Sequence, residues 1–137
     1  MRRLVLAVAV ALVALAIGVP LAFAGNPHFI FVDATRSGDS LIVSGKEAGL
    51  GNETQVHIVV TATAQCINPG GKRPKAANKT SVSAEGDFPV QNGKAEFSLT
   101  LTPSFQPECS PPMTVQFRNV SVMDTEHDLT KSIPGTF

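Results

Sequence analysis

Apolar and polar residues alternate along most of the chain after residue 25, and no long stretch there keeps a helical period. The clearest alternation covers residues 54–66, where apolar residues share one face and Val59 is the sole exception on the other. Residues 94–101 alternate as regularly. Between residues 114 and 123 the apolar positions change parity near Arg118-Asn119, which predicts a β-bulge. These patterns predict three strong strands.

Four weaker alternations fill the intervals between the strong ones. They cover residues 28–34, 40–46, 80–84 with a continuation to 90, and 129–133. Clusters of Gly, Asn, Asp and Ser separate the segments, and Asn92-Gly93 is the most hairpin-like of these turns. About seven short strands predict an all-β domain over residues 25–137, an immunoglobulin-like antiparallel β-sandwich. A small β-barrel is the alternative.

Residues 1–24 have the pattern of a secretory signal peptide. Two arginines precede an apolar run from Leu4 to Ile17, and Ala22-Phe23-Ala24 supplies small residues for cleavage. An uncleaved anchor is the alternative, but the run is shorter than the ~20 residues that a bilayer span needs. We therefore expect a secreted protein, or a periplasmic one in a Gram-negative cell, with no membrane span after cleavage.

Cys66 and Cys109 are the only cysteines, and an oxidising compartment favours a bridge between them. In an immunoglobulin-like order the strands at 54–66 and 114–123 are antiparallel neighbours in one sheet. The two cysteines would then meet at one end of that sheet. This differs from the bridge between sheets in antibody domains. Free thiols and an intermolecular bridge are the alternatives, and neither cysteine has the paired spacing of a zinc ribbon.

Charge and composition exclude several classes of partner. Eleven basic residues balance eleven acidic ones, so nothing favours nucleic acid or an anionic membrane. The chain has no Trp or Tyr, the residues that usually stack on sugars and carry the energy of interfaces. We therefore expect a monomer and no aromatic sugar-binding platform.

Three acidic residues, Asp124, Glu126 and Asp128, share one predicted turn. Oxygen-rich loops can bind calcium, so these residues are a candidate calcium site. The segment does not match an EF-hand, because Leu129 stands where Gly is required and Gly135 where the bidentate Glu is required. An ordinary solvated turn is the alternative.

A second candidate site is the basic loop after Cys66. Its four basic residues are Lys72, Arg73, Lys75 and Lys79. Such a cluster could bind an anionic partner, for example a cell-wall polymer. A solvated loop is the favoured alternative, because no aromatic residue accompanies the charges.

No catalytic motif is present in the sequence. His28, His57 and His127 occur in neither a His-x-His nor a His-Glu-x-x-His pattern, and no Gly-x-Ser-x-Gly occurs. Dispersed residues could still form a hydrolase site around His57 or His127, because triads are defined in space rather than in sequence. We assign no catalytic residue.

Four segments of the mature chain carry a family resemblance. They are Asn26–Phe29, Gly45–Asn52, Cys66–Gly71 with Asn78-Lys79, and Cys109–Pro112. In these motifs the chain resembles a family of small secreted bacterial proteins of unknown function. The resemblance implies one exported β domain with one disulfide, and it transfers no catalytic or ligand-binding residue.

These observations favour a secreted, non-enzymatic β-sandwich that binds a surface component or has another extracellular accessory role. A loop-based binder of calcium or an anion is the second hypothesis. A small secreted hydrolase with dispersed catalytic residues is the third.

Overall fold

The computed structural model describes residues 25–70 and 78–137. These residues form seven strands: β1 (His28–Ser37), β2 (Ser40–Ala48), β3 (Gln55–Ile67), β4 (Lys79–Pro89), β5 (Ala95–Leu101), β6 (Thr114–Asp124) and β7 (Leu129–Ile133). Every pair of neighbouring strands is antiparallel. The expected all-β fold is confirmed. The predicted signal peptide, residues 1–24, lies outside the described residues.

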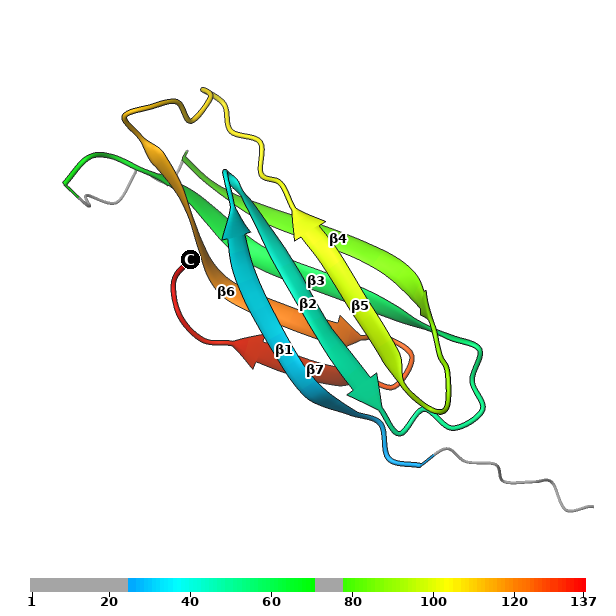
Figure 1. Ribbon diagram of the computed structural model, residues 1–137. Coiled ribbons are helices and arrows are strands. Elements are labelled where there is room, and N and C mark those ends of the chain that lie inside the picture. The colour runs from blue at the N-terminus through cyan, green and yellow to red at the C-terminus, as the bar shows by residue number, and fades with distance from the viewer. Residues whose placement is uncertain (1–24, 71–77) are drawn as a thin grey trace, which may run out of the picture.

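The strands form two layers (Figure 1). One sheet has the order β1-β2-β5 and the other the order β4-β3-β6-β7. β3 and β6 are neighbours, as the predicted strand order requires. The fourth strand pairs with β3, from Gln55↔Pro89 to Gln65↔Lys79. In a constant-type immunoglobulin domain the fourth strand instead belongs to the sheet of the first, second and fifth strands.

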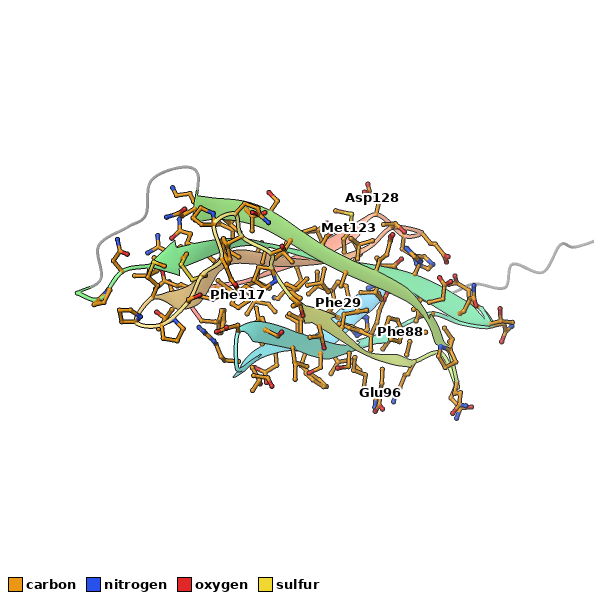
Figure 2. The ribbon with its side chains drawn as sticks, turned by 90° about the horizontal axis from the view of Figure 1, so that it is seen from above. Phe29, Phe88, Glu96, Phe117, Met123 and Asp128 are labelled. Carbon is orange, nitrogen blue, oxygen red and sulfur yellow. A yellow bond between two sulfur atoms is a disulfide. The ribbon has the colours of Figure 1, made fainter. Side chains whose placement is uncertain are left out.

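The hydrophobic core lies between the two sheets, because each strand turns its alternate apolar residues inward. The largest fully buried apolar side chains include Phe117, Leu41, Leu50, Ile58 and Leu101. Burial of a side chain of this size contributes about 1.5–3 kcal/mol. Figure 2 shows Phe29 and Phe117 between the layers and Glu96 and Asp128 outside them.

The predicted β-bulge in β6 is confirmed, and it decides which residues of this strand face the core. Thr61 pairs with Ser121 but Thr63 pairs with Arg118, so the register shifts over Asn119 and Val120. Asn119 adopts a left-handed backbone conformation, with φ of 54°. Before the bulge Val115 and Phe117 are buried; after it Val120, Val122 and Asp124 are buried. The bulge therefore turns an acidic residue into the interior.

The predicted disulfide between Cys66 and Cys109 is confirmed. Their Cα atoms lie 5.7 Å apart, and 43 residues separate them in sequence. The bridge joins the end of β3 to the loop before β6, which is the neighbour of β3 in its sheet. It ties the β5–β6 connection to that end of β3.

No helical segment within residues 25–70 and 78–137 combines the length and apolar character of a membrane span.

Candidate functional site

A buried acidic residue occupies the core-facing row of β2. Leu41, Val43 and Gly45 point inward, and the same alternation places Glu47 in the interior, where its exposed fraction is 0%. Both carboxyl oxygens of Glu47 lack a hydrogen-bond partner among the described residues. A buried polar group without a partner is costly and calls for an explanation.

Asp124 and His127 face Glu47 from the other sheet. Each of the three residues offers one ligand atom, and these atoms all lie within 4.8 Å of one another. Asp124 ends β6 and is also fully buried, while His127 lies in the turn between β6 and β7. No other group of this kind occurs in the described part of the chain.

The β6–β7 turn holds Asp124 and His127 in fixed positions. Oδ1 of Asp124 accepts hydrogen bonds from the backbone amides of Glu126 at 2.9 Å and His127 at 3.2 Å. Its other oxygen, Oδ2, lies 2.6 Å from Nδ1 of His127. An Asp side chain that accepts amides two and three residues later is a common way to build such a turn.

Glu53 completes the group from the loop between β2 and β3. Its Oε2 lies 2.8 Å from Nε2 of His127. The Glu53 amide donates to the carbonyl of Leu50, and the Leu50 amide donates to that of Gly93, so the loop is tied to the β4–β5 hairpin. Gly49 has φ of 78°, and a Cβ there would overlap the Asn26 carbonyl.

We call Glu47, Glu53, Asp124 and His127 the acid–histidine cluster. It lies at the end of the sandwich where the β2–β3 loop and the β6–β7 turn meet, at the right of Figure 1. A shallow hollow in the surface has Glu53, Gly51 and Asn92 in its walls. The cluster therefore reaches solvent through Glu53 and through His127, whose side chain is 20% exposed.

Burial and neighbouring charges shift the pKa values of the cluster. Desolvation of Glu47, together with the adjacent carboxyl group of Asp124 and the other nearby negative charges, raises the pKa of Glu47 to about 9. Burial by itself would raise the pKa of Asp124, but the adjacent Glu47 and the hydrogen bonds from His127 and the Glu126 amide lower it.

Burial disfavours the charged form of His127, yet the hydrogen bond and charge of Asp124 and the charge of Glu53 outweigh this effect and raise the pKa of His127.

The structure brings together a different group from the predicted calcium residues. Asp124 is buried and belongs to the acid–histidine cluster, whereas Glu126 and Asp128 are exposed. Oδ1 of Asp124 is engaged by two amides of its own turn. The calcium site of Asp124, Glu126 and Asp128 stays a prediction.

Three residues of the predicted anion-binding loop, Lys72, Arg73 and Lys75, lie outside the described residues. The fourth, Lys79, is exposed at the first position of β4. Anion binding by this loop stays a prediction as well.

His57 lies on the outer face of β3, beside two acids of β4. Its Nδ1 lies 2.7 Å from Oδ1 of Asp87, and its Nε2 lies 2.9 Å from Oε2 of Glu85. A Ser–His–Asp triad needs one ring nitrogen beside a nucleophilic hydroxyl. In both His57 and His127 the two ring nitrogens contact carboxylates, so neither residue has that arrangement here.

The His57 contacts lead to a pH-dependent contribution to stability. The hydrogen bonds to Glu85 and Asp87 raise the pKa of His57 above its ordinary value of 6.5. Protonated His57 therefore stabilises the fold below pH 6.5, and we expect this contribution to disappear as pH rises through the folded-state pKa. NMR titration of the ring should show the raised pKa, and Glu85→Gln should lower it. A titration midpoint at or below 6.5 would contradict this expectation.

Neither Glu47 nor Glu53 is among the candidate site residues that the sequence predicts. The sequence signal for Glu47 is its position in the alternation. Glu47 continues the inward row of Leu41 and Val43, one residue beyond the predicted strand end at Lys46. Glu53 carries no comparable signal, since a loop residue has no periodic neighbour to show where it points.

Comparison with protein-family models, with curated proteins and with solved structures gives no significant match for this chain. The family that the sequence motifs resemble is therefore not identified. Of the features that this resemblance implies, the structure shows a small all-β domain and one disulfide.

Proposed function

We propose that this chain is an exported β-sandwich of the immunoglobulin-like class that acts by binding, and that its ligand is a divalent cation at the acid–histidine cluster. The observation that carries the proposal is Glu47, a fully buried carboxyl group whose oxygens have no partner among the described residues. A cation beside Glu47 and Asp124 would supply the positive charge that two adjacent buried carboxylates need.

Two features support export. The first 24 residues have the order of charge, apolar run and small residues that a signal peptide needs. The Cys66–Cys109 bridge is compatible with an oxidising compartment. Binding of a cell-surface component, the first expectation from the sequence, stays a prediction.

Equilibrium dialysis of the full chain tests cation binding. The protein is made in an oxidising compartment, stripped with a chelator and dialysed against Ca²⁺, Mg²⁺, Mn²⁺ or Zn²⁺. We expect one equivalent of at least one of these ions to bind and to raise Tm, because a ligand of the folded state stabilises it by mass action.

Glu47→Gln is the informative variant, because it keeps the side-chain shape and removes the charge. We expect it to reduce cation affinity at least tenfold. Glu96→Gln is the matched control, since Glu96 lies on the adjacent strand with its side chain 80% exposed beside Lys46. Absence of binding for every ion, or equal affinity in Glu47→Gln and the wild type, would overturn the proposal.

A further inference from the structure

We propose that the cation of the acid–histidine cluster is a transition-metal ion of the zinc class, ligated by Glu47, Asp124 and Nδ1 of His127. Glu53 acts as a positioning residue that holds the imidazole from behind. This inference rests on the proposed function and specifies which cation the site takes.

The donor set selects against calcium. Calcium takes six to eight oxygen ligands, whereas the cluster brings two carboxylates and one ring nitrogen together. Imidazole combined with carboxylate is a common ligand set for zinc and related ions. Zinc lies ~2.0–2.2 Å from such donors, so two donors on one ion lie at most ~4.4 Å apart. The observed limit of 4.8 Å lets the three side chains close on one ion through small rotations.

The outer contacts that a histidine ligand needs are already present. A metal-bound histidine usually donates its second ring N–H to a carboxylate, which fixes the ring. Nε2 of His127 lies 2.8 Å from Oε2 of Glu53, so this contact leaves Nδ1 for the metal. Nδ1 now faces Oδ2 of Asp124 at 2.6 Å, and a cation would enter between these two atoms.

The carboxylate of Asp124 is also held in a fixed position by hydrogen bonds. Its Oδ1 accepts the amides of Glu126 and His127, which fixes the carboxylate and directs Oδ2 toward the cluster. Glu47 approaches from the opposite sheet with both oxygens free of partners among the described residues. Three protein ligands on zinc leave a fourth position for water.

Metal binding displaces protons, because ligands bind a metal ion in their deprotonated forms. The cation would form bonds to an oxygen of Glu47, to Oδ2 of Asp124 and to Nδ1 of His127. Any proton on Glu47 or on Nδ1 of His127 leaves to solvent as the bond to that atom forms, and no redox step is involved.

Cobalt provides the direct test. Stoichiometric Co²⁺ added to the stripped full chain should produce visible d–d bands of a low-coordinate site, and Zn²⁺ should abolish them. Millimolar Ca²⁺ should leave the bands unchanged. NMR of the Zn²⁺-loaded protein should show the His127 ring protonated at Nε2 only.

Variants separate the ligands from the positioning residue. We expect Glu53→Gln to retain the single site and to weaken Zn²⁺ binding about 10–100-fold, the usual loss for an outer-shell partner. His57→Gln is the matched control, because His57 also contacts two carboxylates but lies on the outer face of β3. We expect it to leave the cobalt spectrum unchanged.

The outcomes distinguish this inference from the proposed function. If Ca²⁺ binds at the cluster and Co²⁺ and Zn²⁺ do not, the cation-binding function stands and the zinc-class inference is wrong. If the cobalt bands disappear in His57→Gln and persist in Glu47→Gln, the metal lies elsewhere and both proposals are wrong. If no ion binds at all, both proposals are also wrong.

Discussion

Asp124→Ala should lower the free energy of unfolding by about 3–5 kcal/mol, the range for removing one member of a buried ion pair. The substitution leaves the amides of Glu126 and His127 without their acceptor at the end of β6. It also leaves the His127 ring with Glu53 as its remaining hydrogen-bond partner. Urea unfolding of the wild type and the variant in chelator measures the difference.

Glu47→Gln is the contrasting variant, because burial of the Glu47 carboxyl group lowers the stability of the metal-free protein. Its pKa of about 9 in the folded state exceeds the ordinary value of 4.5, so the folded protein binds more protons than the unfolded chain between these values. Stability of the wild type therefore falls as pH rises through this window, and the Glu47→Gln variant should lose this dependence.

We expect metal-free Glu47→Gln to be at least as stable as the wild type at pH 8, although it binds the cation less tightly. A large loss of stability in Glu47→Gln, or a loss below about 1 kcal/mol in Asp124→Ala, would contradict the roles assigned to these two carboxyl groups.

Loss of the Cys66–Cys109 bridge should lower the free energy of unfolding by up to about 4 kcal/mol. The bridge closes a loop across a sequence separation of 43 residues, and the estimate follows from the entropy that such a loop removes from the unfolded chain. Domains of this kind have a total stability of about 5–15 kcal/mol, so the effect is large.

Urea unfolding before and after reduction gives the measurement, and the Cys66→Ala, Cys109→Ala double variant gives a second value without reductant. We expect the sheets to persist in both, because their alternating apolar faces do not depend on the bridge. The far-ultraviolet circular dichroism spectrum should therefore keep its β character. Complete unfolding on reduction, or a change below about 1 kcal/mol, would contradict this account.

The local pattern of the sequence predicted most of the fold. Side chains alternate between the two faces of a strand, so the parity of Val56 and Ile58 on β3 already indicates which residues are buried. The parity change near Arg118-Asn119 predicted the bulge, and Asn92-Gly93 predicted the hairpin, where both residues adopt positive φ. The cysteine count and the expected export predicted the disulfide.

Sequence reasoning found only one half of the candidate site. It singled out Asp124, but it grouped this residue with Glu126 and Asp128 because the three lie close in sequence. The predicted strands end at Met123 and at Lys46, one residue short of Asp124 and Glu47. One further step of the alternation on each strand places both acids at inward positions.

The sequence by itself determined the strands, their buried faces and the means of joining Cys66 to Cys109, because these follow from residue periodicity and composition. Only the tertiary structure decided that Glu47 of one sheet meets Asp124 and His127 of the other. Periodicity specifies the face on which a side chain lies, but it contains no information on which strand packs opposite in the second layer. That pairing depends on the stacking of the sheets, and it is the stacking that turns two separate acids into one buried cluster.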